Sequence, residues 1–345
     1  MTRGKGRQEL ALFPVLSMHI ADKIITAPFS VILCALAFCL AISPNAWAEA
    51  GLDIEYAEMQ PLSTESILLD VTRSGGRLVA VGERGHVIFS DNGTEWKQAE
   101  HVPTRSTLTS VVAQGGRFWA GGHDAVIITS GDGGNTWSQQ YFDPDRQQAV
   151  MDFLFTDENN GVAIGSYGLV LTTTDGGKTW NDELVDPEND FHLNSMVRYE
   201  DGRRLIAGEA GFSYRSYDDG ASWEPMELPY IGSMWGALFT SPDCVLFFGL
   251  RGHAMESCDF GMSWQELDTG TLSSLSGGTA RDGEVVVVGN SGIVLIREDG
   301  KISQYQHSSG VDFSAVIPME DDSYLLVGEE GVHQFPETVA EESGQ

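Results

Sequence analysis

The strongest constraint on the fold is a unit of about 40 residues that recurs seven times along the chain. Each copy contains a Gly-x-x-Gly turn between two short apolar segments, and consecutive turns start 39 to 43 residues apart. The turns begin at Gly82, Gly122, Gly165, Gly208, Gly249, Gly289 and Gly328; in the second copy Ala125 replaces the last glycine. Five tryptophans follow with steps of 41 to 43 residues. Two independent markers therefore share one period.

A period near 40 residues with four short strands per unit is typical of the blades of a β-propeller. In the third copy the four predicted strands are Val150–Phe155, Gly161–Gly165, Leu169–Thr173 and Trp180–Val185. We predict an all-β fold, a seven-bladed β-propeller of four-stranded antiparallel blades that spans residues 49–337. Because no blade can bury its apolar faces alone, the ring must close.

The seventh copy, Asp312–Glu337, contains three predicted strands and lacks an outer one. The segment Glu55–Pro61 is similar to the predicted outer strand Trp223–Pro229 of the fourth copy. We expect Glu55–Pro61 to complete the seventh blade, which would leave no open edge where the ring joins. Residues 338–345 are acidic, and we expect them to form a disordered tail.

Four copies carry the motif Ser/Thr-x-Asp-x-Gly-x-Ser/Thr-Trp before the outer strand, and the first copy retains only its Asp, Gly and Trp. An Asp in such a turn accepts backbone N–H groups across the loop, the Gly tolerates positive φ, and the Trp packs between blades. We therefore assign structural roles to Asp91, Asp132, Asp175, Asp218, Asp259, Trp96, Trp137, Trp180, Trp223 and Trp264.

This turn is the Asp-box, or BNR, motif, and the chain resembles the Asp-box propeller families over residues 55–337. These families include the sialidases and the photosystem II assembly/stability factors with their relatives in non-photosynthetic bacteria. The resemblance to the assembly factors rests on the export signal, the seven repeats and the Gly-x-x-Gly…Asp-Gly-Gly-x-Thr-Trp pattern. It implies a non-catalytic, extracytoplasmic protein that binds subunits of a membrane complex. The bacterial relatives imply an association with a membrane transporter.

The alternative function is that of a sialidase-like glycoside hydrolase or a carbohydrate-binding module. A sialidase needs three arginines that converge on the substrate carboxylate, a Tyr nucleophile with a Glu partner, and an Asp acid. The chain lacks the Arg-Ile-Pro signature of sialidases, whose propellers have six blades. It also lacks a P-loop, a Gly-x-Ser-x-Gly elbow and metal-ligand spacing of its histidines. We therefore expect no catalytic residue, no metal and no cofactor.

The net charge of −30, from 50 acidic and 20 basic side chains, restricts the partners. Such a surface repels nucleic-acid phosphates and anionic lipid headgroups, so we expect neither nucleic acid nor a membrane surface. The Gly-x-x-Gly turns of a propeller surround one mouth of its channel, and loops on a rigid scaffold often carry function. We expect a monomer that binds a protein there, through Arg84, His86, His123, Tyr167, Arg251 and His253. Alternatively, both arginines merely pair with local carboxylates.

Residues 1–48 have the form of an export signal, with basic residues, an apolar run over Phe29–Ile42 and an Ala46-Trp47-Ala48 cleavage site. The alternatives are an uncleaved membrane anchor and a true start at Met18. We expect the mature protein in the periplasm or an equivalent extracytoplasmic space.

Cleavage would leave two cysteines, Cys244 and Cys258, in an oxidising compartment. They flank the fifth Gly-x-x-Gly turn, and we predict a disulfide between them. The expected register is off by one residue, an offset that a β-bulge would absorb. The alternative is two free thiols packed as small apolar groups.

Overall fold

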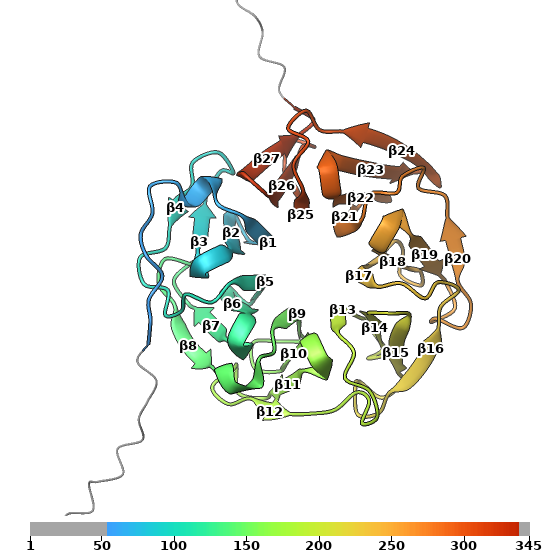
Figure 1. Ribbon diagram of the computed structural model, residues 1–345, viewed down its shortest axis with the longest axis horizontal. Coiled ribbons are helices and arrows are strands. Elements are labelled where there is room, and N and C mark those ends of the chain that lie inside the picture. Colours follow the sequence, from blue (N-terminus) through green and yellow to red (C-terminus); the bar gives the residue numbers. More distant parts are fainter. Residues whose placement is uncertain (1–53, 338–345) are drawn as a thin grey trace, which may run out of the picture. The chain divides into compact units, whose positions relative to one another are not determined.

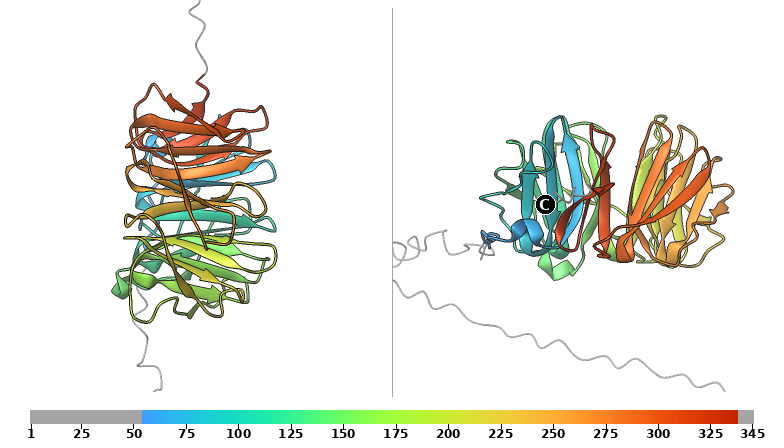
Figure 2. Two further views of the ribbon diagram at one scale, coloured as in Figure 1. Left: turned by 90° about the vertical axis from the view of Figure 1, so that its right-hand side faces the viewer. Right: turned by 90° about the horizontal axis from the view of Figure 1, so that it is seen from above.

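The computed structural model describes residues 54–337, which form a ring of seven antiparallel β-sheets around a central axis (Figure 1). Six sheets have four strands, and the seventh has three among the described residues. Within each sheet the strands follow one another in sequence order, so each blade is formed by one consecutive stretch of chain. Figure 2 shows this ring edge-on as a disc with the blades side by side. The prediction of an all-β, seven-bladed propeller is confirmed.

The strands of blades one to three are β1 (Leu68–Ser74), β2 (Arg77–Gly82), β3 (Val87–Ser90), β4 (Lys97–Gln98), β5 (Leu108–Gln114), β6 (Arg117–Gly122), β7 (Ile127–Ser130), β8 (Ser138–Tyr141), β9 (Val150–Phe155), β10 (Gly161–Gly165), β11 (Val170–Thr173) and β12 (Asn181–Asp182). Those of blades four and five are β13 (Leu193–Arg198), β14 (Arg204–Gly208), β15 (Phe212–Ser216), β16 (Glu224–Glu227), β17 (Met234–Phe239), β18 (Val245–Gly249), β19 (Ala254–Ser257) and β20 (Gln265–Leu267). Those of blades six and seven are β21 (Leu275–Arg281), β22 (Glu284–Gly289), β23 (Ile293–Glu298), β24 (Lys301–Gln306), β25 (Phe313–Pro318), β26 (Tyr324–Gly328) and β27 (Gly331–Phe335).

The hydrophobic core lies between neighbouring blades. The second strand of each blade is covered on both faces, which explains its continuous apolar run; Phe118, Trp119 and Ala120 of β6 are fully buried, for example. The first and last blades meet in the same way, because Leu68 of β1 packs in one cluster with Val327 of β26. The ring is therefore closed by side-chain packing between consecutive blades.

The expected completion of blade seven by Glu55–Pro61 is wrong. This segment instead follows the outer side of blade one, where the Ala57 N–H donates to the Val102 carbonyl at 2.9 Å and Arg105 Nε donates to the Tyr56 carbonyl at 3.0 Å. The link after β4 thus supplies the hydrogen-bond partners that blade seven was expected to supply. In the described part of the chain, β27 pairs with β26 alone.

Cys244 and Cys258 form the predicted disulfide, with their Cα atoms 4.0 Å apart. The expected offset of one residue is wrong. Because β18 and β19 pair Val245 with Ser257, the two cysteines stand directly opposite each other, and no bulge is needed.

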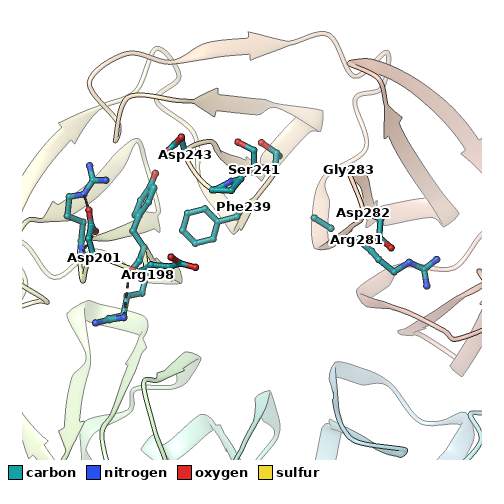
Figure 3. Close-up of a pocket in the computed structure, with 14 residues that line it drawn as sticks. Arg198, Asp201, Phe239, Ser241, Asp243, Arg281, Asp282 and Gly283 are labelled. Carbon is teal, nitrogen blue, oxygen red and sulfur yellow. Dashed lines mark hydrogen bonds and ion pairs between the residues drawn. The ribbon is translucent and has the colours of Figure 1, made fainter.

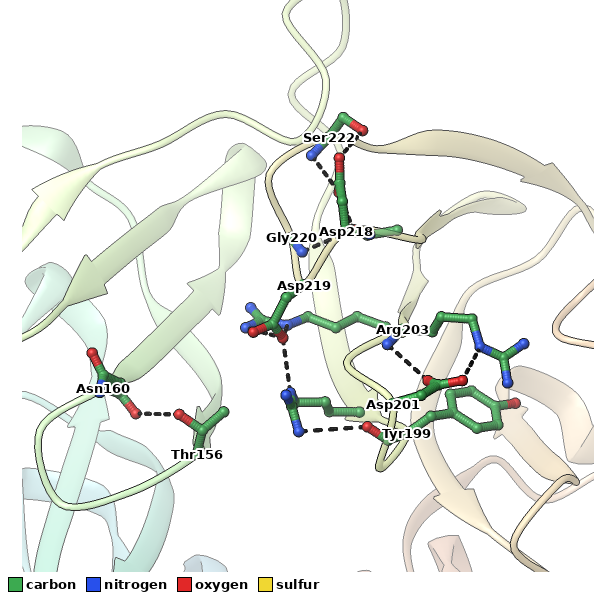
Figure 4. A network of polar contacts seen from close by, with 12 residues as sticks. Thr156, Asn160, Tyr199, Asp201, Arg203, Asp218, Asp219, Gly220 and Ser222 are labelled. Carbon is green, nitrogen blue, oxygen red and sulfur yellow. Dashed lines mark hydrogen bonds and ion pairs between the residues drawn. The ribbon is translucent and has the colours of Figure 1, made fainter.

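The Asp-box turns are organised by one carboxylate each. In blade four, Asp218 accepts hydrogen bonds from the Ser222 N–H at 2.8 Å and from the Ser222 and Ser216 hydroxyls at 2.7 and 2.9 Å (Figure 4). Ser216 Oγ in turn accepts the Gly220 N–H at 2.8 Å. Asp132, Asp175 and Asp259 make the corresponding contacts in their blades.

Asp91 does not have the role that the motif predicted for it. In blade one the acceptor is Asn92, whose side-chain oxygen receives the N–H groups of Thr94 and Glu95 at 3.0 and 2.9 Å. Asp91 points outward and pairs with Arg77 at 2.9 Å. This turn is one residue shorter, so aligning it on its Trp shifts the acceptor by one position.

The Asp-box tryptophans lie in the interfaces between blades. Trp137 packs between blades one and two, Trp180 between two and three, Trp223 between three and four, and Trp264 between four and five. Trp96 reaches back to blade seven. The proposed export signal at 1–48 and the acidic tail at 338–345 lie outside the described residues. Within residues 54–337 no helix has the length and apolar character that crossing a membrane requires.

Candidate protein-binding face

The seven Gly-x-x-Gly turns and the links that join consecutive blades pack against each other. Five turns contain short 3-10 helices: η2 (Glu83–Gly85), η3 (His123–Ala125), η5 (Ser166–Gly168), η6 (Leu250–Gly252) and η7 (Asn290–Gly292). The second glycine of several motifs faces a link closely; a Cβ on Gly85 would lie 2.2 Å from the Thr104 carbonyl oxygen, and one on Gly252 2.2 Å from the Thr271 carbonyl oxygen. Turns and links therefore share one face, here named the turn face.

The residue before that second glycine stands in the left-handed backbone region, with φ of 55° at Arg84, 52° at Tyr167 and 59° at Arg251. Blade two keeps this pattern: Asp124 has φ of 60°, and Ala125, in the place of the second glycine, has φ of 50° and donates its N–H to the Gln148 carbonyl at 2.8 Å. The repeated turn thus presents one side chain per blade at its tip, whatever the residue type.

Four of the six residues predicted to bind a partner are exposed on the turn face: Arg84, His123, Tyr167 and Arg251. His253 is half-buried; its Nδ1 lies 2.7 Å from Glu266 Oε1, and its ring stacks on Tyr230 with centroids 3.7 Å apart. A partner can touch the edge of this ring, but the main contacts of His253 are internal.

His86 is not a surface residue, which corrects its place in the predicted site. Its side chain is buried, and Nδ1 lies 3.0 Å from Ser66 Oγ. Burial lowers the pKa of His86, so the ring stays neutral at physiological pH. The residue supports the chain that enters blade one.

The two turn arginines are free of strong local pairing. Arg84 Nε lies 3.8 Å from Glu83 Oε2 while its side chain remains 76% exposed. Within residues 54–337, Arg251 has no carboxylate within 4.0 Å. They belong to blades one and five, which are not neighbours in the ring (Figure 1). The structure therefore does not bring them together into one site.

Arg251 does have neighbours that favour binding. A cleft of about 540 Å³ beside the η6 turn is lined by Arg251, His253 and Leu272, and Leu272 is 86% exposed. Ile231, also 86% exposed, lies in the link that enters blade five, against the Gly211 turn of blade four, and the hydroxyl of its neighbour Tyr230 donates to the Leu250 carbonyl. Ile231, Arg251 and Leu272 are here named the blade-five patch.

Sequence reasoning missed Ile231 and Leu272 because it examined the turns and not the links. The sequence of the links does contain a feature that indicates both residues. Each is a large aliphatic residue in a link that follows an outer strand, and each is followed directly by small residues, Gly232 and Ser233 after Ile231 and two serines after Leu272. Such a side chain has no blade face to cover, so it projects into solvent.

The opposite face carries a cleft of about 610 Å³ at the channel mouth, between the inner hairpins of blades four, five and six (Figure 3). Three arginines line it, the number that a sialidase-like site needs. They do not converge, since Arg198 and Arg281 lie on opposite sides of the cleft and point away from each other (Figure 3). Arg198 pairs with Asp219 at 2.8 Å and Arg203 with Asp201 at 2.7 Å (Figure 4).

No group of three or more His, Cys, Asp or Glu side chains suited to a metal ion occurs in the part of the chain that the structure describes.

Comparisons with known proteins agree with the fold. Residues 140–231 match the family model described as photosynthesis system II assembly factor YCF48. The chain is a BNR-type propeller similar to YCF48. Two solved YCF48 structures resemble it with a TM-score of 0.65: "YCF48 bound to D1 peptide", at 20% identity over 83% of this chain and 98% of the other, and "YCF48 from Cyanidioschyzon merolae", at 17% over 81% and 97%.

The fold alone does not separate a YCF48-like binding protein from an enzyme. A streptogramin B lyase structure matches with a TM-score of 0.69 at 16% identity, over 81% of this chain and 96% of the other. The comparison with curated proteins gives no significant match. Similarity to YCF48 is therefore carried by the family model, and the function must be argued from the surface.

Proposed function

We propose that this protein is an exported, non-catalytic scaffold that assists the assembly or stability of a membrane protein complex by binding an exposed segment of one subunit. The blade-five patch carries the proposal, because the links before and after blade five each expose an aliphatic side chain at 86%, and the turn of this blade carries an arginine that no carboxylate neutralises in the described residues. The YCF48 structure with a bound D1 peptide supports a protein segment as the ligand.

The physical basis is the cost of leaving such side chains in water. Covering one aliphatic side chain contributes about 1.5–3 kcal/mol, and arginine is enriched where interfaces gain most of their free energy. The three residues stand on a rigid scaffold, so little ordering entropy is lost on binding. The net charge of −30 disfavours nucleic acid and anionic lipid as the ligand.

The family match favours a photosystem II-like assembly partner, and the resemblance to bacterial relatives favours a membrane transporter. For either partner, we propose that the binding segment lies outside the cytoplasm, where cleavage after Ala48 would release the propeller. The mass of the protein isolated from the envelope tests this: a mature N-terminus at Glu49 is expected, and an intact residue 1–48 segment would contradict it.

Co-purification from intact envelopes tests the binding proposal. The double variant Ile231→Asp/Leu272→Asp and the variant Arg251→Glu should each reduce recovery of the partner about tenfold or more. The double variant places charges in an apolar contact, and Arg251→Glu reverses the charge of the turn. Met262→Asp is the matched control, because Met262 is 67% exposed in the Asp-box turn of the same blade on the opposite face. Unchanged recovery, or an equal loss in the control, would refute the proposal.

A further inference from the structure

Blade seven is the only blade without a fourth strand in the part of the chain that the structure describes. β27 pairs on one side with β26, from Tyr324 opposite Phe335 to Gly328 opposite Gly331. No backbone hydrogen bond joins its other side to any described residue. An unpaired strand edge presents a row of N–H and C=O groups that can pair with another extended chain.

A groove lies next to this edge, between blades six and seven. Its volume is about 500 Å³, and its walls include Ile296 of β23, Tyr305 of β24, Tyr324 of β26 and Phe335 of β27. Tyr305 is 45% exposed, and its ring meets that of Phe335 edge-on at 5.5 Å. The groove is therefore an aromatic and aliphatic slot open to solvent.

The other blades show what normally fills this position. The outer strand of each of blades one to five begins after an Asp-box Trp that packs against the preceding blade, and in blade six Ile302 takes that place. A groove of about 480 Å³ also lies between blades three and four, where Trp223 and the outer strand β16 are both present. Between blades six and seven the core cluster receives no outer-strand residue from blade seven. Among the described residues, blade seven therefore combines a groove with a free strand edge, whereas the groove at blade four adjoins a complete four-stranded sheet.

The charge around the groove indicates what can fill it. Four carboxylates line it, those of Asp282, Glu284, Glu298 and Asp322, against one cation, Arg281. Arg281 is already engaged, donating to the Met319 carbonyl at 2.6 Å and pairing with Asp322 at 3.3 Å. An occupant must therefore bring positive charge.

The chain's own termini fit this requirement poorly. Residues 338–345 include Glu341 and Glu342, have no basic or aromatic residue, and would add negative charge to an acidic rim. Glu55–Pro61 is held on blade one. A partner segment is the occupant that matches both the groove and its charge.

We propose that blade seven is completed in trans: an extended, basic segment of a partner protein pairs with the free edge of β27 and places a large apolar side chain in the groove between blades six and seven. The site is separate from the blade-five patch and does not depend on the function proposed for it.

Synthetic peptides of about ten residues test the proposal on the mature protein. The first alternates Lys and Thr around a central Trp, the second has Glu for each Lys, and the third has Pro at alternate positions, which removes the N–H groups needed for strand pairing. The first should bind and slow amide exchange in residues 331–335, and the other two should bind at least about tenfold more weakly. Absence of binding, or equal binding of the Pro peptide, would overturn strand addition.

Two variants sharpen the result. Asp282→Lys/Glu298→Lys reverses two exposed rim charges and should weaken binding about tenfold, whereas Glu183→Lys, at the groove beside the complete sheet of blade four, should not. The Ile231→Asp/Leu272→Asp variant should bind the peptide normally, which separates this site from the blade-five patch. Removal of residues 338–345 tests whether the tail pairs with β27. If the amides of β27 are protected from exchange in the whole protein and lose that protection in the shortened one, the tail is the fourth strand and the proposal fails.

Discussion

Asp70 of blade one holds Val111 of blade two: its Oδ2 accepts the Val111 N–H at 2.8 Å while Oδ1 accepts the Val71 N–H at 2.8 Å. Asp152 repeats the arrangement two blades on, where Oδ2 accepts the Met196 N–H at 2.7 Å. Burial raises the pKa of Asp70 to about 7 and that of Asp152 to about 6, against the opposing effect of these N–H donors. Each carboxyl group thus links two inner strands and is sensitive to pH.

This pKa shift predicts that the contribution of Asp70 to stability falls as pH rises. The folded protein holds the Asp70 proton more tightly than the unfolded chain, whose pKa is 3.8, so this contribution is full below about pH 4 and is lost by about pH 7. Asp70→Asn removes this titration. The urea midpoint at pH 8, relative to that at pH 5, should therefore be higher in the variant than in the native protein. Glu95→Gln, on the surface, is the control. An unchanged pH dependence in Asp70→Asn would contradict the assignment.

The Asp-box geometry predicts unequal effects of two similar substitutions. Asp132→Ala removes the acceptor for the Thr136 N–H and hydroxyl and should lower the free energy of unfolding by about 1 kcal/mol or more. Asp91→Ala removes only a surface ion pair and should stay within about 0.5 kcal/mol of the native protein. Urea unfolding measures both. Equal losses would mean that Asp91 does organise its turn.

The disulfide closes a loop with a sequence separation of 14 residues and should stabilise the fold by about 2–3 kcal/mol. The double variant Cys244→Ser/Cys258→Ser should therefore show a lower Tm, and a reductant should lower the Tm of the native protein but not of the variant. A native Tm that is insensitive to full reduction, verified by intact mass, would argue against this role.

The packing of turns against links predicts that Gly85→Ala is poorly tolerated. Gly85 has φ of +71°, and the added Cβ would lie 2.2 Å from the Thr104 carbonyl oxygen, so we expect a loss of at least about 2 kcal/mol. The reverse change at the corresponding position of blade two, Ala125→Gly, should alter stability by less than about 1 kcal/mol, because the link there already accommodates a Cβ. Urea midpoints of the two variants compare them directly.

Much of the fold was predictable because the spacing of glycine and tryptophan reflects a steric requirement. A Cβ on Gly82 would stand 2.0 Å from the Ile67 carbonyl oxygen, so the repeat can be recognised in a single sequence. Asp91 was misassigned because the first turn is one residue shorter than the others, and pattern matching on Trp96 carries no information about which side chain accepts the N–H groups.

The functional surface was less predictable, because exposure depends on neighbours distant in sequence. His86 and His253 follow the same Gly-x-Arg-Gly pattern, yet His86 is buried beside Ser66, which lies 20 residues away, and His253 stacks on Tyr230. Glu55–Pro61 looked like an outer strand, but Val102 and Arg105 offered closer partners than blade seven. None of these relationships follows from local sequence.

The way the ring closes has a consequence for the connectivity of the molecule. Within residues 54–337 every blade uses consecutive strands, and no strand from one end enters the sheet of the other. The seam between β1 and β25 is therefore held by the same kind of contact as every other junction. Joining residues 54 and 337 through a flexible peptide and opening the chain in another inter-blade link should leave the propeller intact. The order of the blades along the chain would then not determine the architecture of the folded ring.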